Sequence, residues 1–173
     1  MAITLFPDGR ILHNGVEMAS DKMHDQWVVE SDGDSPNGLI TNWTRSSLAY
    51  GAAYLTGMTH NSGIFTFPKT GIYRVDLKIG YYRSDHRRYI GGIMKLSTDS
   101  GSSYGDLTRS YTGLYDVSSS QSYGTTISQV HVDIQNASTH RIKFECVNDN
   151  TVTVYGANDD IRTMVMFERI AGT

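Results

Sequence analysis

The sequence contains a single cysteine, Cys146, among its 173 residues. One thiol cannot form a disulfide within the chain, and it cannot supply a metal site built from several thiolates. Strand alternation in the stretch 141–148 places Cys146 on the same side as Ile142 and Phe144. We therefore interpret Cys146 as a small buried apolar residue.

Long hydrophobic runs are missing as well. No stretch approaches the roughly 20 apolar residues that cross a bilayer as a helix, so we expect no membrane partner. The opening residues 1–15 lack the basic segment and the apolar stretch of a secretory signal. These features predict synthesis in a cytoplasm without export of the common kind.

An excess of positive charge is also lacking, because 15 Lys and Arg residues stand against 18 Asp and Glu residues, for a net charge of −3. A nucleic-acid-binding chain usually carries a basic field, so we expect no nucleic-acid partner. The hydrophobic fraction of 39% is that of a folded protein, and the length suffices for one substantial core.

The sequence lacks common motifs of enzymes. It has no phosphate-binding glycine loop, no dinucleotide fingerprint and no nucleophile elbow. Ser84, Asp85 and His86 are adjacent, but consecutive residues point in different directions, whereas a catalytic triad needs a base held against its nucleophile. We predict a protein that is not an enzyme and has no cofactor.

Three Asn/Asp clusters, at 32–34, 148–150 and 158–160, offer oxygen atoms suited to calcium. None follows the spacing of the helix–loop–helix calcium site. The same residues are frequent in tight turns, because their side chains hydrogen-bond to their own backbone. Turns are the favoured interpretation and no metal site is predicted, although the sequence leaves calcium binding open.

Short alternating runs, broken by Gly, Asn, Asp and Ser, fill the chain instead. They predict an all-β protein with on the order of ten strands, arranged as a double-sheet jelly-roll sandwich. The clearest run, 71–83, has one apolar face and one polar face, and an apolar face of this length requires a second sheet packed on it. The apolar face consists of Tyr73, Val75, Leu77, Ile79 and Tyr81.

The first 26 residues predict an N-terminal arm with a small hairpin, because Pro7, Asp8 and Gly9 form a turn between two short apolar runs. The sandwich is predicted to span 27–173. Few apolar residues anchor the arm, so we expect it to become ordered against a partner.

The stretch 99–124 is rich in Tyr, Ser and Gly, and it predicts a largely exposed loop with one edge strand near 107–111. This composition is shared by binding loops and by plain polar loops. The turn 83–88 adds a basic tip, and arginine pairs readily with carboxylates on a partner. The candidate partner-contact residues are Arg83, Arg87, Arg88, Tyr104, Tyr111 and Tyr115.

The hairpin at 63–73 resembles the signature of the globular heads of complement component one q, which share a jelly roll with the tumour-necrosis-factor cytokines. The residues that match the family's spacing are Gly63, Phe65, Pro68, Gly71 and Tyr73. The stretches 130–156 and 163–170 look like later strands of the family, so the resemblance covers about 27–170. It implies a homotrimer, and from the long strand and the final strand we expect Tyr81, Met166 and Phe167 near the threefold axis.

Tailed bacteriophages encode similar proteins with a short N-terminal arm, so the resemblance also implies a virion protein. Our first hypothesis is a trimeric capsid decoration (cement) protein on the outer surface of a phage head, whose arm contacts the major capsid protein. The alternative is the receptor-binding tip of a tail or head fibre, with 99–124 contacting host glycans. The third hypothesis, an enzyme acting on sugars, would need a pair of carboxylates about 5 to 9.5 Å apart.

Overall fold

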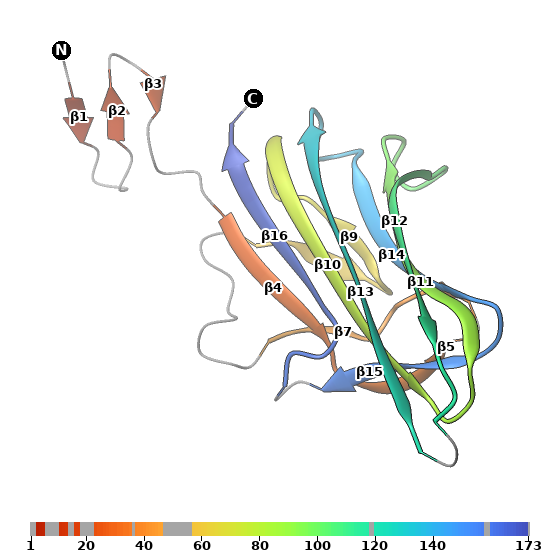
Figure 1. Cartoon of the computed structure of the whole chain (residues 1–173). Coiled ribbons are helices and arrows are strands. Elements are labelled where there is room, and N and C mark those ends of the chain that lie inside the picture. Colours follow the sequence, from red (N-terminus) through yellow and green to blue (C-terminus); the bar gives the residue numbers. More distant parts are fainter. Residues whose placement is uncertain are drawn as a thin grey trace.

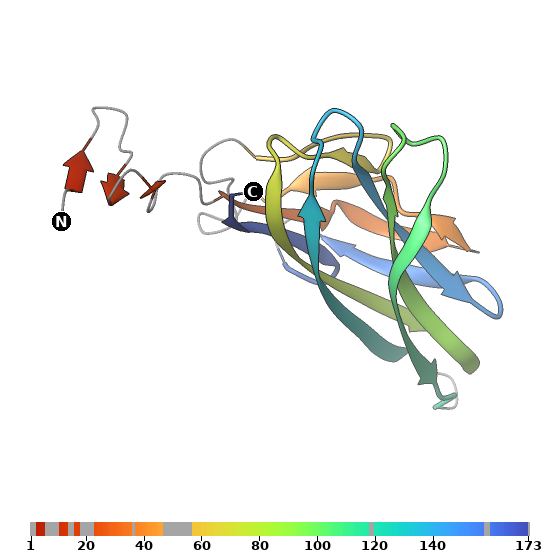
Figure 2. The ribbon, with the colours of Figure 1, turned by 90° about the horizontal axis from the view of Figure 1, so that it is seen from above.

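The chain folds into two antiparallel sheets that face each other, as shown by the computed structural model (Figure 1, Figure 2). The structure describes residues 3–5, 11–13, 16–17, 23–35, 37–46, 57–117, 120–157 and 160–172. The predicted all-β sandwich is confirmed. Within these ranges, no helix has the length and apolarity to span a bilayer.

The first sheet has seven strands and is built around β10. Figure 1 shows its strands β4, β16, β10 and β13 side by side in this order. The seven strands are β4 (Met23–Val29), β5 (Ser31–Ser35), β7 (Trp43–Arg45), β10 (Gly71–Arg83), β13 (Ser122–Ile134), β15 (Val152–Ala157) and β16 (Met164–Ala171).

The second sheet has six strands in the order β12–β11–β14–β9–β8, with β6 also paired to β14. Their bounds are β6 (Gly38–Leu39), β8 (Thr59–Asn61), β9 (Ile64–Thr66), β11 (Arg87–Ser97), β12 (Gly105–Leu114) and β14 (Arg141–Asn148). The turn between β8 and β9 requires glycine, because Gly63 has φ of +83° and a Cβ there would lie 2.2 Å from the Ile40 carbonyl oxygen.

Strand β10 follows the predicted alternation, and it pairs with β13 along its whole length. On its other side it pairs first with β16 and then with β15. The five predicted apolar residues of this strand are all buried against the second sheet. Burial of this face fixes the register, because a shift by one residue would expose all of it.

Aromatic rings fill the space between the sheets. Phe65 contacts Phe144 and Phe167, with ring centroids 5.6 and 5.2 Å apart, and Trp27 and Trp43 extend the cluster. Cys146 is buried in the same core, as predicted. Such tightly packed rings contribute more than their buried area alone.

In the first 26 residues, β1 (Ile3–Leu5) pairs antiparallel with β2 (Ile11–His13), and β3 (Val16–Glu17) adds a third strand. Pro7, Asp8 and Gly9, the predicted turn, lie outside the described residues. Strand β4 pairs with β16 from its first residue, Met23, onward.

The stretch 99–124 contains the edge strand that was predicted near 107–111. The strand is longer than predicted, because ten residues form β12, which pairs with β11 at the edge of the second sheet. Gly92 of β11 allows the two sheets to approach closely, because a Cβ there would lie 2.8 Å from the Ile79 Cδ1 atom.

Candidate interaction surface

The first sheet turns one face to the core and the other to solvent. We call the solvent side of β10, β13 and β16 the open face. Pairing places its side chains in lateral rows, so that Lys78 lies between Ile127 and Met164, and Asp76 lies between Gln129 and Met166. Its members are Arg74, Asp76, Lys78, Tyr82, Tyr123, Ile127, Gln129, His131, Met164, Met166 and Glu168.

The open face carries exposed apolar side chains on β13. Tyr123, near the start of β13, is 60% exposed, and Ile127, farther along the strand, is 70% exposed. Sequence alternation already placed Ile127 among Gln129, His131 and Asp133 on the polar side. One isoleucine on an otherwise polar face indicates an interaction surface, and the sequence analysis did not use this feature.

A tyrosine cluster stands at one end of the open face. The ring centroids of Tyr82, Tyr123 and Tyr155 lie 5.2 to 5.8 Å from one another. The Tyr82 hydroxyl donates to Asp32 Oδ2 at 3.0 Å, and the Arg162 guanidinium lies 4.0 Å from the centre of the Tyr155 ring. These contacts fix the rings in place, so little side-chain entropy is left to lose when a partner covers them.

Several polar side chains of the open face are paired within the chain. The Arg74 guanidinium forms an ion pair with Asp76 at 2.9 Å, and Gln129 Nε2 donates to the other Asp76 oxygen at 2.5 Å. The Lys78 ammonium donates to the Ile161 carbonyl at 2.8 Å. Charges that already have partners within the chain cost less to bury than free charges.

Of the three residues predicted at a threefold axis, Tyr81 and Phe167 lie inside the chain's own core. The Tyr81 hydroxyl donates to the Gly91 carbonyl of the opposite sheet at 2.6 Å, and burial raises its pKa far above the usual value. The prediction is therefore wrong for these two residues. Met166 is half-buried on the open face, and its place at an axis stays a prediction.

The predicted partner-contact residues separate into two ends of the sandwich. Pairing of Arg87 with Leu114 puts the turn 83–88 beside the segment that follows β12, where Tyr115 is 82% exposed. Tyr104 lies at the opposite end of β11 and β12, half-buried, with the Lys143 ammonium 4.2 Å from its ring centre. The six candidate residues therefore do not share one surface, and their contact with a partner stays a prediction.

Arg87 is buried and holds the turn together, which removes it from the predicted contact set. Its guanidinium forms an ion pair with Asp85 at 2.9 Å and donates twice to the Thr151 carbonyl oxygen. Arg83 pairs with the same carboxylate at 3.3 Å. Because two arginines hold Asp85, it does not orient His86, and the Ser84-Asp85-His86 sequence does not form a triad.

Asp99 organises the turn that carries Tyr104. Its carboxylate accepts hydrogen bonds from Ser103 N at 2.9 Å, Ser103 Oγ at 2.5 Å and Ser97 Oγ at 2.6 Å. The bonds from Ser103, and then that from Ser97, hold the pKa of Asp99 well below its usual range. A depressed pKa in the folded state means that the ionised carboxylate stabilises the fold at neutral pH.

Asp99→Asn is therefore expected to be less stable than the unchanged protein at pH 7. The difference should shrink as the pH falls below about 3.9, where the carboxyl of the unfolded chain takes up its proton. Thermal unfolding of both proteins between pH 7 and about pH 2 measures this. A difference that stays constant over the whole range would contradict the assignment.

Asp106 and Glu145 both contact Lys95, at 3.7 and 2.8 Å. A glycoside-cleaving pair needs one carboxyl that is protonated near neutral pH. The hydrogen bond from Arg109 lowers the pKa of Asp106. Burial raises the pKa of Glu145, but hydrogen bonds from Lys143 and Lys95 outweigh it and leave a lowered value. Both carboxylates are therefore ionised, and this pair cannot supply the acid.

The Asn/Asp clusters are used for local structure where the structure describes them. Asp149 Oδ2 accepts the Arg88 backbone N–H at 3.0 Å, and Asp160 forms an ion pair with Arg162 at 2.9 Å. Asn158 and Asp159 lie outside the described residues. Within the described ranges, His, Cys, Asp and Glu nowhere gather in a group of three or more suited to a metal ion.

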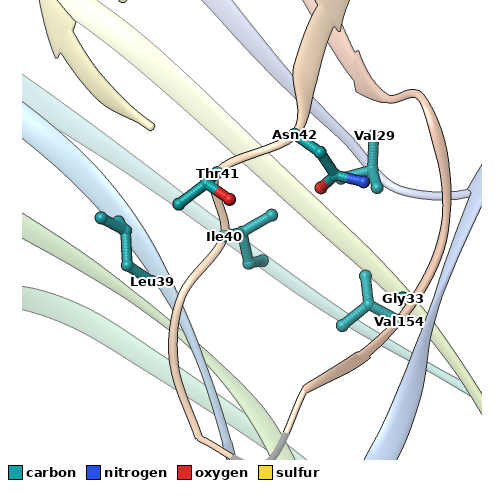
Figure 3. A pocket seen from close by; sticks show the side chains of 7 residues that line it. All are labelled: Val29, Gly33, Leu39, Ile40, Thr41, Asn42 and Val154. Atoms are coloured by element: carbon teal, nitrogen blue, oxygen red, sulfur yellow. The ribbon is translucent and has the colours of Figure 1, made fainter. Parts of the chain in front are cut away.

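A pocket of about 210 Å³ opens where the segment 39–42 passes β4 and β15 (Figure 3). Its side chains carry no titratable group, and the Asn42 amide already donates to the Ser31 carbonyl at 3.1 Å. Acid–base chemistry is therefore not available from the lining itself. The lining consists of Val29, Gly33, Leu39, Ile40, Thr41, Asn42 and Val154.

No protein-family model matches the chain. Comparison with curated protein sequences also finds no match. Solved structures do match its fold. Eiger TNF from S. frugiperda superposes with a TM-score of 0.66 at 12% identity, over 88% of this chain and 93% of that one. Murine APRIL at pH 8.5 superposes with a TM-score of 0.62 at 13% identity, over 87% of this chain and 100% of that one. The chain therefore has a TNF-like jelly-roll fold.

Proposed function

We propose that the protein is a non-enzymatic assembly protein that forms a homotrimer through the open face. The observation that carries this proposal is the exposure of Tyr123 and Ile127 on an ordered strand of a rigid sheet. Exposed apolar side chains of this size mark interaction surfaces. The jelly-roll family that the sequence resembles consists typically of homotrimers packed through one sheet, which supports the choice of partner.

The composition of the open face supports burial against further copies of the chain. Tyr123, Ile127, Met164 and Met166 supply apolar and aromatic area, and the tyrosine cluster supplies rigid rings of the kind found at the centre of interfaces. The ion pair between Arg74 and Asp76 satisfies the neighbouring charges within each protomer. An interface containing both kinds of side chain can be stable and still fix one orientation.

We further propose that the trimer is a capsid decoration protein on the outer surface of a phage head. The N-terminal strands β1 to β3 form a small sheet of their own, which Figure 1 shows outside the sandwich. Ile3 in this sheet is 66% exposed. An arm with an exposed apolar residue suits contact with the major capsid protein, while the sandwich faces away from the shell.

The receptor-binding tip of a fibre is the second candidate. It is favoured by the tyrosines at the end of the sandwich that holds the turn 83–88, where Tyr111 and Tyr115 are both exposed. Rigid aromatic side chains of this kind bind ligands at a low cost in conformational entropy.

Light scattering on the purified protein tests the trimer, with an expected mass of three times 19.2 kDa. A clean monomer at micromolar concentration would overturn it. Electron microscopy of virions labelled with an antibody against the protein then separates the two candidates. Label over the whole head supports decoration, and label confined to fibre tips supports receptor binding. The absence of label from virions would overturn both.

A further inference from the structure

A second surface, on the other sheet, has the features of a ligand site. Tyr111 on β12 lies opposite Gly91 on β11. A Cβ on Gly91 would lie 2.7 Å from Tyr111 Cδ1 and 3.0 Å from Cε1, so the ring occupies the space above the glycine. The missing side chain lets the tyrosine lie directly on the backbone of the sheet. Tyr111 is 51% exposed, so it offers solvent an aromatic surface whose position is fixed from below.

A second ring stands beside this surface. The rings of Tyr89 and Tyr111 are 6.0 Å apart at their centroids and meet at 83°, so the two rings form a corner. The Tyr111 hydroxyl accepts a hydrogen bond from Arg109 Nη1 at 3.4 Å, and Arg109 in turn forms an ion pair with Asp106. The orientation of the corner is therefore set before any ligand arrives, which reduces the entropy lost on binding.

One positive charge next to the corner has no acidic partner within the described ranges. Arg88 is exposed, and its guanidinium lies 5.3 Å from the centre of the Tyr89 ring. Its backbone N–H binds the Asp149 carboxylate, but no ion pair of its guanidinium occurs in this part of the chain. A guanidinium of this kind can bind a carboxylate with two parallel hydrogen bonds.

We propose that Arg88, Tyr89 and Tyr111 form a binding site for an acidic saccharide. A sugar ring presents a face of C–H groups that packs on a tyrosine ring, while its hydroxyl groups stay in water. A uronic-acid carboxylate on the same ring reaches Arg88. This site lies on the opposite sheet from the open face, so it goes beyond the trimer and does not depend on it.

Single-stranded nucleic acid is an alternative ligand, because its bases can stack on aromatic side chains and its phosphates carry negative charge. Its binding requires a row of cations along the phosphate backbone. Here the neighbouring arginines are already paired, Arg109 with Asp106 and Arg87 with Asp85. The net charge of the chain is −3 as well. Among the described residues, one cation without an acidic partner stands beside the two rings, and this fits one charged sugar better than a polyanion.

The test is titration calorimetry of the full chain at low ionic strength with three probes: an oligogalacturonate, its methyl ester and a thymidine oligonucleotide of similar length. We expect saturable binding of the oligogalacturonate. Arg88→Gln should weaken this binding by about tenfold, the size of one charge-assisted hydrogen-bonded contact. The unchanged protein should bind the methyl ester more weakly than the oligogalacturonate, because esterification removes the carboxylate that Arg88 contacts. For the same reason, the unchanged protein and Arg88→Gln should bind the methyl ester with equal affinity.

One control variant matches the change without touching the site. Arg162→Gln removes another arginine that lies over a tyrosine. It should bind the oligogalacturonate with unchanged affinity. Tyr111→Ala should abolish saturable binding, with its folded state verified by thermal unfolding.

Absence of oligogalacturonate binding would overturn the proposal, as would an Arg88→Gln protein with unchanged affinity or a methyl ester that binds as tightly as the acid. A thymidine oligonucleotide that binds more tightly than the oligogalacturonate, and loses affinity in Arg88→Gln, would replace the saccharide by nucleic acid. A protein that is monomeric but binds the oligogalacturonate would overturn the trimer and leave this site standing.

Discussion

Replacing Asp25 by alanine is expected to lower the free energy of unfolding by about 3 to 5 kcal/mol. Asp25 lies on β4 and its side chain is fully buried. Its carboxylate accepts hydrogen bonds from Trp27 Nε1 at 3.0 Å, from Arg45 Nε at 2.9 Å and Nη2 at 3.0 Å, and from the Met58 backbone N–H at 2.7 Å. One side chain thus joins β4, β7 and the segment that leads into β8.

The loss is large because the groups that remain cannot all find other partners. The Arg45 guanidinium also donates to the Met58 carbonyl at 2.7 Å and lies 4.5 Å from the centre of the Trp27 ring, so its position is fixed. The hydrogen bond from Arg45 to Asp25 is the main reason that the pKa of Arg45 is raised. Removal of the carboxylate leaves the Trp27 and Met58 N–H groups buried without an acceptor.

Urea denaturation of the purified variant measures the effect. Asp160→Ala is the matched control, because Asp160 also pairs with an arginine but is 61% exposed. It should change the unfolding free energy by less than about 1 kcal/mol, as exposed ion pairs do. An Asp25→Ala protein as stable as Asp160→Ala would show that the buried carboxylate is not needed to join these strands.

Alternation was sufficient to predict the interior of β10, because five apolar residues with a period of two can bury only one face. It could not predict the role of Asp25. The stretch 23–29 has no regular alternation, and the partner Arg45 lies 20 positions along the chain. An ion pair between a buried carboxylate and a distant, partly exposed arginine leaves no periodic signal in a single sequence.

The error at Tyr81 and Phe167 has a related cause. Alternation tells which residues share a face, but it does not tell which face meets the second sheet and which one meets another molecule. Met166 and Phe167 are neighbours on one strand, so they point to opposite faces and cannot both lie at an axis. Ile127 alternates in sequence with Gln129 and His131, and the structure has it on the outward face of β13.

Changing Ile127 to aspartate is expected to convert the proposed trimer into monomers, raising the dissociation constant by about 100-fold or more, as loss of a central interface residue does. Ile127 is the most exposed large apolar residue of the open face, between the tyrosine cluster and the pair formed by Arg74 and Asp76. In a trimer the three introduced carboxylates would be desolvated together and would repel one another.

The monomer itself should tolerate this change. The side chain is largely in solvent, so the unfolding free energy of the isolated chain should shift by no more than about 0.5 kcal/mol.

Val117→Asp is the matched control, since Val117 is 52% exposed but lies between β12 and β13, outside the open face. Light scattering over a dilution series compares the two variants. If Ile127→Asp stays as trimeric as Val117→Asp, the open face is not the trimer interface. If Ile127→Asp unfolds instead, the comparison is repeated with Ile127→Ser, which removes the apolar contact without adding a charge.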